Sequence, residues 1–413
     1  MDQRMPVNEP AAPRPVIVSM FRYPIADHEA MNNIFPAMLK ELATTSDVHH
    51  FSYRSEKPHA LHGHPGIFFH EFPIGVRRGH NADKWLKTLL WFPLSLRVAW
   101  QARRLKAGFI YIEEYITFLP LLLRLVSGCP VVVSGADIFW DVYLGHGFFS
   151  GLARKFLLAV DRFTWRRLRG IITRTEAMRR YMASQGVEAE KAFVVPEACE
   201  TSFFHPMDRV AARREWDLQE DDLVIVHHGI LHPNKNLDHA FEYLRPAFSK
   251  HPGLRLWIAG DGPLRGYLER RASELGMADR VRFLGWLPDV TRLNSLLNAA
   301  DISLIMRHGG FSDHFQVTAN LLHSLACGCA ILAVRLDGIA ENAEEGVSAL
   351  MFDPESGEEF SRQLERLIAD PALRGRLREG AERVARERLD PRRITDLWVR
   401  ALRHFAGEEK TAT

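Results

Sequence analysis

Residues that could do chemistry gather in polar, glycine-containing turns between Leu223 and Phe352. Each turn follows a short apolar run of the kind that predicts a buried strand. The turns read His-His-Gly-Ile-Leu-His-Pro-Asn-Lys, Gly-Asp-Gly-Pro, Gly-Trp-Leu-Pro and Arg-His-Gly-Gly. In parallel α/β sheets, ligands bind at the carboxyl ends of the strands, where such turns lie. This half of the chain is therefore predicted to hold a ligand that carries phosphate groups.

Three positions around these turns could bind a phosphate oxygen. Lys235 closes the first turn, and Arg307 follows the predicted strand Ile302–Met306. Thr318 is a predicted helix N-cap, where free backbone N–H groups suit a phosphate. Lys235 and Arg307 also have a plainer interpretation, because most lysines and arginines in such places are solvated surface groups.

Two runs of alternating strands and helices must position these residues. They extend over residues 16–196 and 223–352, and the polar segment Glu200–Asp222 between them is a predicted linker. Such alternation predicts an α/β fold in which helices cover both faces of a parallel sheet. After residue 352 the chain is predicted to be helical to Ala406. Helices of the first run are expected over Glu29–Leu42, Trp85–Leu105, Leu119–Leu125, Phe149–Arg169 and Met178–Ser184.

The composition is that of a globular protein. The chain has 413 residues, 46% of them hydrophobic and 25% charged, which favours two domains. A net charge of +2 gives no argument for a nucleic-acid partner, and no nucleic-acid-binding module is recognised. The four cysteines form no CxxC pair and lack zinc-ligand spacing, so no metal site is expected and a reducing, cytoplasmic compartment is the simplest interpretation.

No segment is predicted to cross a membrane, because no apolar run approaches eighteen residues without a charge. Two helices nevertheless combine basic and aromatic residues, over Lys84–Lys106 and Phe149–Arg169. Basic amphipathic helices can lie on anionic lipid surfaces. The alternative is that their apolar sides pack on the sheet and their charges are solvated. The localisation expected from the sequence is therefore cytoplasmic, with peripheral attachment to the inner face of a membrane left open.

Six short segments together resemble the GT-B glycosyltransferases, in particular the large retaining group called family 4 or group 1. Each segment is weak alone, but all six occur in the family's order and at compatible spacing. The segments are Val194–Pro206, similar to IPNGVD…FxP; Gly229–Asn236, similar to GRLxPxKG; Gly260–Pro263 for GxGP; Val281–Gly285 for VxFxG; Leu325–Ala333 for MAxGxPVVA; and Gly338–Gly346 for GxPExxxxG.

The chain departs from this family at polar positions. The arginine of the GRL turn is Ile230, and the two glutamates that stand eight residues apart fall on Phe315 and His323. In the first half, the family's His-Asp pair is Ala136-Asp137, and the first turn, Ser19–His28, contains no glycine. The resemblance therefore implies the fold more directly than it implies the usual contacts to a donor.

The resemblance assigns roles residue by residue. Lys235 takes the place of the phosphate-binding lysine, and His323 the place of the glutamate that binds the donor ribose. Gly229 and Gly262 belong to turns beside the donor, and the backbone of Trp286 and Leu287 lies near the nucleobase, whose identity stays open between uracil and guanine. Arg307 and Thr318 would contribute to the phosphate site. Glu341 would contact the sugar or lie near the phosphate; alternatively it is a first-turn glutamate favoured by the helix dipole.

On the acceptor side, Asp137 has motif support and is assigned a catalytic role together with Lys235. Asp27, His28, Glu113 and Glu114 also lie near predicted strand ends, where local capping or surface exposure is the alternative. No acid–base pair at a defined spacing emerges. That fits a retaining transfer in which the leaving phosphate accepts the acceptor's proton, and it equally fits an inactive protein.

The resemblance implies two facing Rossmann-like domains and a final helix that crosses back to the first. The expected boundaries are 15–205 for the acceptor side, 206–390 for the donor side and 391–406 for the helix, with disordered tails at 1–14 and 407–413. The implied activity is transfer of a hexosyl group from a nucleotide sugar to a lipid-linked or polysaccharide acceptor, with no metal ion or other cofactor. The alternatives are a non-catalytic partner subunit or chaperone and, less favoured, a sugar-nucleotide epimerase.

Overall fold

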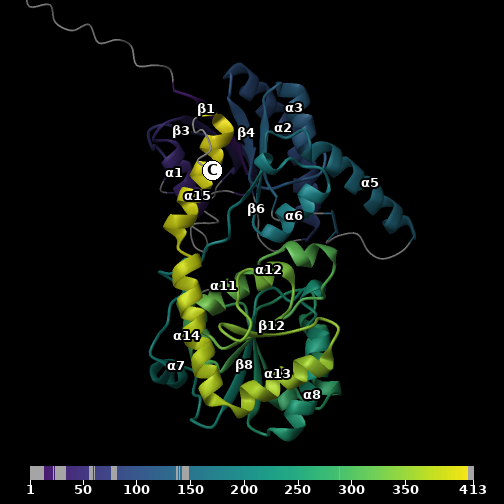
Figure 1. The fold of residues 1–413 in the computed structure, drawn as a ribbon, viewed down its shortest axis with the longest axis vertical. Helices are drawn as coiled ribbons and strands as arrows, with labels where there is room; N and C mark the ends of the chain where they lie inside the picture. The colour runs from purple at the N-terminus through teal and green to yellow at the C-terminus, as the bar shows by residue number, and fades with distance from the viewer. Residues whose placement is uncertain are drawn as a thin grey trace, which may run out of the picture.

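The computed structural model describes residues 14–21, 23, 34–54, 59, 61–75, 81–135, 138, 140–141, 148–287 and 289–407. In these residues two parallel sheets lie in separate halves of an elongated molecule, the first above the second in Figure 1. This confirms the predicted α/β class. The central strands, such as β4, β5, β11 and β12, are short apolar runs buried on both faces, as helices on the two sides of a parallel sheet require.

The first sheet has the strand order β3-β2-β1-β4-β5-β6-β7, and its neighbouring strands pair in parallel. Its strands are β1 Val16–Met20, β2 Asp47–Arg54, β3 Ile67–Gly75, β4 Phe109–Ile112, β5 Val131–Ser134, β6 Gly170–Thr173 and β7 Ala192–Val194. Its helices are α1 Ile34–Leu42, α2 Asn81–Arg104, α3 Leu119–Ser127, α5 Phe148–Trp165, α6 Glu176–Ser184 and the 3₁₀ turn η2 Ala189–Lys191. The start of the helix predicted over Glu29–Leu42 lies outside the described residues.

The second sheet has the order β10-β9-β8-β11-β12-β13, again with parallel pairs. Its strands are β8 Leu223–His228, β9 Leu254–Ala259, β10 Val281–Gly285, β11 Ile302–Ile305, β12 Ile331–Val334 and β13 Ala349–Phe352. The helices are α8 Leu237–Lys250, α9 Arg265–Glu274, α10 Val290–Ala299, α11 Ala319–Ala326, α12 Asp337–Ala340 and α13 Gly357–Ala369, with 3₁₀ turns η3 Pro233–Lys235, η4 Ala278–Arg280 and η5 Phe311–Phe315.

The last two helices connect the halves. Helix α14, Pro371–Arg388, runs beside the second half, and α15, Pro391–Ala406, continues beside the first (Figure 1). Trp398 of α15 donates a hydrogen bond to the hydroxyl of Tyr111 on β4 at 3.0 Å. The buried apolar face of α15 shares a core with α1 and the first sheet. The final helix therefore crosses back to the first half, as predicted.

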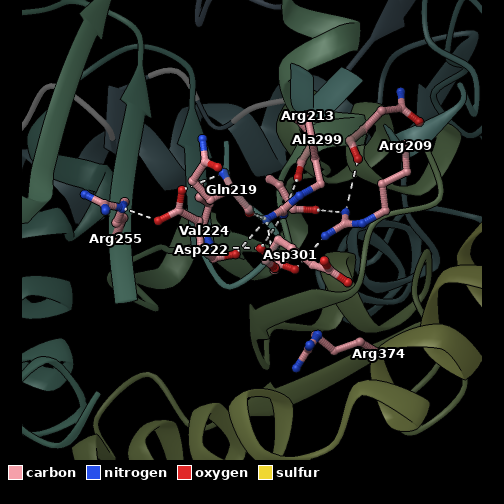
Figure 2. A network of polar contacts seen from close by, with 12 residues as sticks. Arg209, Arg213, Gln219, Asp222, Val224, Arg255, Ala299, Asp301 and Arg374 are labelled. Atoms are coloured by element: carbon pink, nitrogen blue, oxygen red, sulfur yellow. Dashed lines mark hydrogen bonds and ion pairs between the residues drawn. The ribbon is translucent and has the colours of Figure 1, made fainter. Parts of the chain in front are cut away.

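The predicted linker contains a helix that the sequence pattern did not indicate, α7 Arg209–Glu215. Asp208 caps it, because its carboxylate accepts a hydrogen bond from the N–H of Val210 at 2.9 Å. Arg209 and Arg213 then reach the buried Asp301, at 2.6 and 3.2 Å (Figure 2). This polar helix is held by a carboxylate some ninety residues later in the chain, so local periodicity carries no sign of it.

Candidate functional site

Segments that follow the strands of the two sheets meet between the halves. Thr175, directly after β6, donates a hydrogen bond from its hydroxyl to the carbonyl of Phe315 at 2.9 Å. The backbone N–H of Ser312 donates to Asp141 at 3.2 Å. Tyr181 of α6 stacks on Phe315, with ring centroids 5.0 Å apart. The carboxyl edges of both sheets therefore face this interface, where a ligand of a parallel α/β fold is expected.

The turn after β8 places Lys235. The ring of His232 accepts a hydrogen bond from the N–H of Asn234 at 3.4 Å, and Asn236 adopts a left-handed conformation, with φ 53°, before α8 begins. Lys235 is half-buried at the end of η3. Its positive charge lowers the pKa of both His227 and His228, after the larger effect of burial. Lys235 therefore lies in electrostatic range of the end of β8.

The glycines of the neighbouring turn have a structural reason. A Cβ on Gly262 would lie 2.5 Å from the carbonyl oxygen of Leu231, and one on Gly260 would lie 1.8 Å from that of Gly229. Only glycine lets the two turns approach so closely. Gly229 itself has φ +125° and open space around its Cβ position. Beyond β10, the Trp286 side chain is 57% exposed, so it is available to a ligand.

Arg307 is buried, so the alternative interpretation of a solvated surface group is wrong for this residue. It forms an ion pair with Asp313 of η5 at 3.0 Å, and both side chains are 8% exposed. The Nε of Arg307 is buried with no hydrogen-bond partner in the described part of the chain. Asp313 therefore balances most of the charge that Arg307 could offer to a phosphate.

Thr318 stands at the N-cap of α11, but its side chain makes no capping hydrogen bond. The predicted N-cap position is therefore confirmed, and the hydroxyl is left without a capping bond. Its Oγ1 is buried without a partner among the described residues, and so are both side-chain amide atoms of Asn320, two residues further on. Unpaired buried polar atoms are costly and rare in folded proteins. Three such atoms at the start of one helix, at the interface edge of the sheet, point to a ligand that satisfies them.

His323 of α11 is packed against two aromatic neighbours. Its ring stacks on Phe204 with a centroid distance of 3.8 Å and an interplanar angle of 10°. Its Nδ1 lies 3.3 Å from Nε2 of His228, the last residue of β8. Burial lowers the pKa of His323 to about 4 and that of His228 well below its usual value. Both imidazoles are therefore neutral near pH 7.

Glu341 does not lie in the first turn of a helix, so that interpretation is wrong. It is the C-cap residue of α12, and its carboxylate accepts hydrogen bonds from the N–H groups of Glu176 and Ala177 at 2.6 and 2.7 Å. These groups are the N-terminus of α6 in the other half, with Arg180 at 3.4 Å. A carboxylate is stabilised at the positive end of a helix. Glu341 thus caps a helix of the opposite half, a contact that only the folded chain brings about.

The acceptor-side candidates divide into three that lie outside the described residues and two, Glu113 and Glu114, that directly follow β4. Asp137, Asp27 and His28 lie outside the described residues. Glu113 follows β4 and pairs with Arg174 at 3.0 Å, and burial raises the pKa of Glu113 to about 7. Arg174 also binds Glu197 at 2.9 Å and stacks over the ring of Trp398. Glu113 therefore belongs to a buried cluster that joins the first sheet, the connection between the halves and α15.

Sequence reasoning missed His228 and Asn320. Their only signal was position: His228 immediately precedes Gly229, and Asn320 lies in the first turn of the helix that Thr318 begins. The described residues contain no group of three His, Cys, Asp or Glu side chains that could hold a metal ion.

Two family models match the chain in the order of its two halves. Residues 28–198 match the glycosyl transferase 4-like domain, and residues 208–384 match the glycosyl transferases group 1. The two matches cover the first sheet from β2 onward and the whole of the second.

Curated relatives are also glycosyltransferases. A D-inositol 3-phosphate glycosyltransferase of Acidothermus cellulolyticus is 33% identical over 218 residues, which are 51% of this chain and 47% of that protein. The lipopolysaccharide core biosynthesis glycosyltransferase LpsE of Rhizobium meliloti is 32% identical over 39% of this chain and 45% of its own length. The chain thus spans about half the length of these relatives.

Solved structures share the fold over nearly the whole chain. HepE of Anabaena, in complex with UDP and glucose, has a TM-score of 0.69 at 16% identity and covers 94% of this chain and 98% of its own. Sucrose-phosphate synthase of Thermosynechococcus elongatus has a TM-score of 0.74 at 16% identity, covering 96% and 100%. At such identities the likeness concerns the fold alone. The two family models, one for each half, show that the chain belongs to the group 1 glycosyltransferases, and the solved structures show that it has a GT-B fold.

Proposed function

We propose that the chain transfers a sugar from a nucleotide-sugar donor to a lipid-linked or polysaccharide acceptor, with retention of configuration. The observation that carries the donor site is the set of unpaired buried polar atoms at Thr318 and Asn320, on the same sheet edge as Lys235. The structure of HepE with UDP and glucose supports a nucleotide sugar as the donor. The lipopolysaccharide and phosphatidylinositol dimannoside enzymes among the relatives support the acceptor class.

In this proposal the chemistry is electrostatic. The departing diphosphate gains negative charge, which preorganised donors and cations stabilise. Lys235 supplies a cation, and the start of α11 supplies backbone N–H groups and the side chains of Thr318 and Asn320. These groups take the place of a divalent cation, so the proposal needs no metal ion or other cofactor. Gly229, Gly262, Trp286 and Leu287 would line the nucleoside side of the site.

The acceptor would bind on the first half. Asp137 is proposed to contact its attacking hydroxyl, while the leaving phosphate accepts the proton.

The alternative of a non-catalytic subunit draws on one observation: Phe315, where the resemblance expects a glutamate, is buried against Tyr181 in the interface. A nucleotide-binding measurement distinguishes the two, because a subunit without a donor site should bind no nucleotide.

Nucleoside diphosphates are expected to stabilise the purified protein against heat. A ligand that binds only the folded state at 100 times its Kd adds about 2.7 kcal/mol. UDP and GDP should be compared with UMP, which lacks the second phosphate that the site near Lys235 is proposed to bind. Equal melting temperatures with and without every diphosphate, up to millimolar concentration, would contradict the donor site.

We further propose that α5 contacts an anionic membrane surface. No described helix is long and apolar enough to cross a membrane. The outward side of α5 nevertheless carries both large apolar and basic residues, with Phe156 60% and Phe163 47% exposed. A groove of about 750 Å³ at its carboxyl end is lined by further cations, namely Arg124, Arg166, Arg167, Arg169 and Lys191. Helix α2 supports this less, since its Trp91 is buried although Trp100 is exposed.

Binding to liposomes that contain anionic lipid should therefore be strong at low salt and weak at high salt. Phe156→Glu should reduce co-sedimentation. The matched control is Val210→Glu, which places the same charge at a similarly exposed apolar position (58%) in the other half. Equal loss in both variants, or no binding at low salt, would reject this surface.

A further inference from the structure

Two buried histidines from different elements form a pair at the proposed donor site. His228 ends β8, immediately before the Gly229 turn, and His323 projects from α11. His228 Nε2 and His323 Nδ1 lie 3.3 Å apart, within hydrogen-bond distance. The stacked ring of Phe204 holds the His323 plane. The pair thus joins the turn that carries Lys235 to the helix whose start carries unpaired polar atoms.

The pair can share only one proton in this contact. Both rings are neutral near pH 7, so each carries one N–H. If His228 donates from Nε2, its Nδ1 is an unprotonated lone pair and the proton of His323 is on Nε2. If His323 donates from Nδ1, the proton of His228 is on Nδ1, and the Nε2 of His323 is bare.

The surroundings of His228 distinguish the two arrangements. Its Nδ1 is buried and has no hydrogen-bond partner among the described residues. A proton there would make a buried N–H without an acceptor, which is rarer in folded proteins than a buried acceptor without a donor. The first arrangement avoids it. The Nε2 of His323 bonds no described protein group and is not among the buried unpaired atoms, and the residue keeps 7% of its surface exposed.

We infer that His228 is a positioning residue that fixes the tautomer of His323, so that His323 Nε2–H is a hydrogen-bond donor to an acceptor oxygen of the bound nucleotide. This rests on the proposed donor site. A carboxylate at position 323 would accept protons from ribose hydroxyls. The histidine pair inverts that polarity: the site is built for a ligand oxygen that accepts, on the ribose or the diphosphate.

The tautomer can be measured without any nucleotide. Nitrogen-15 NMR of histidine-labelled protein separates protonated from unprotonated ring nitrogens, and His323→Gln assigns the resonances. The expected result is a protonated Nε2 and an unprotonated Nδ1 on His323. In His228→Phe, which keeps a ring but removes the partner, both tautomers of His323 should be populated. A protonated Nδ1 on His323 in the unsubstituted protein would overturn the inference.

Binding of UDP and GDP by calorimetry tests the polarity. His323→Gln keeps an N–H donor and should bind within about threefold of the unsubstituted protein, whereas His323→Glu should bind at least about tenfold more weakly, because a carboxylate has no hydrogen to donate to the ligand oxygen. Equal or tighter binding by His323→Glu would overturn the inference. If His228→Phe fails to fold, His228→Gln keeps a donor toward His323 and should retain the NMR pattern. No nucleotide binding by the unsubstituted protein would instead reject the donor site and leave the tautomer result standing.

Discussion

Replacement of Lys235 by alanine is expected to weaken the binding of a nucleoside diphosphate about 10- to 150-fold, because a hydrogen bond between charged groups contributes about 1.5–3 kcal/mol. The turn around Lys235 is shaped by other residues, namely His232, Pro233 and Asn236. The alanine variant should therefore keep the turn and lose the cation. Turnover should fall at least as far, since the charge on the diphosphate grows as the bond to the sugar breaks.

The measurement is nucleotide affinity by calorimetry, with the melting temperature of the ligand-free protein as a check on folding. Lys250→Ala is the matched control: it removes a lysine of the same half, at the end of α8, that is 64% exposed and paired with Glu365. Lys235→Arg should recover part of the affinity because it restores the charge. Affinity that survives Lys235→Ala would reject the role of this lysine and leave the rest of the site to be tested.

Asp301→Asn is expected to destabilise the second half by about 3 kcal/mol, the lower end of the range for removing one partner of a buried ion pair. Asp301 binds Arg209 with one oxygen and Arg213 with the other, and also accepts the N–H of Val224 on β8 at 2.9 Å (Figure 2). Burial already lowers the pKa of Arg209 to about 10. Asparagine keeps the shape and the acceptor for Val224 but leaves two partly buried arginines without a counter-charge.

Urea unfolding measures this loss, and hydrogen exchange of the β8 amides localises it. Asp222→Asn is the control, because it makes the same change in the same network (Figure 2) at a pair whose arginine, Arg255, is 43% exposed. An ion pair of that exposure contributes about 0–1 kcal/mol. Similar losses of unfolding free energy in the two variants would show that the burial of Asp301 is not the reason for its contribution to stability.

The fold could be predicted from the sequence because its signals are local. Runs such as Leu223–Val226 and Ile302–Met306 are apolar and short, and the structure has β8 and β11 there. The glycines of Gly260–Pro263 were expected in a turn, and the close approach to Gly229 and Leu231 explains why. Predicted ends differ by a few residues, as for α5, which stops at Trp165 rather than Arg169.

The site was only partly predictable, because its side chains are set by partners far away in the chain. The type of residue at 307 indicated a cation, but only the fold shows Asp313 balancing it. Glu341 matched a donor-loop motif, whereas its carboxylate caps a helix 165 residues earlier. The pairing of His228 with His323 spans 95 residues.

The sequence by itself determined the two α/β halves, the turns that face the interface and the lysine at the end of the first of them. Periodicity and turn chemistry depend on residues that are a few positions apart, so both can be recognised in a single sequence. The tertiary structure decided which polar groups are paired and which are left for a ligand, at Thr318 and Asn320. Burial and pairing depend on every element that packs around a group, and no local pattern records that.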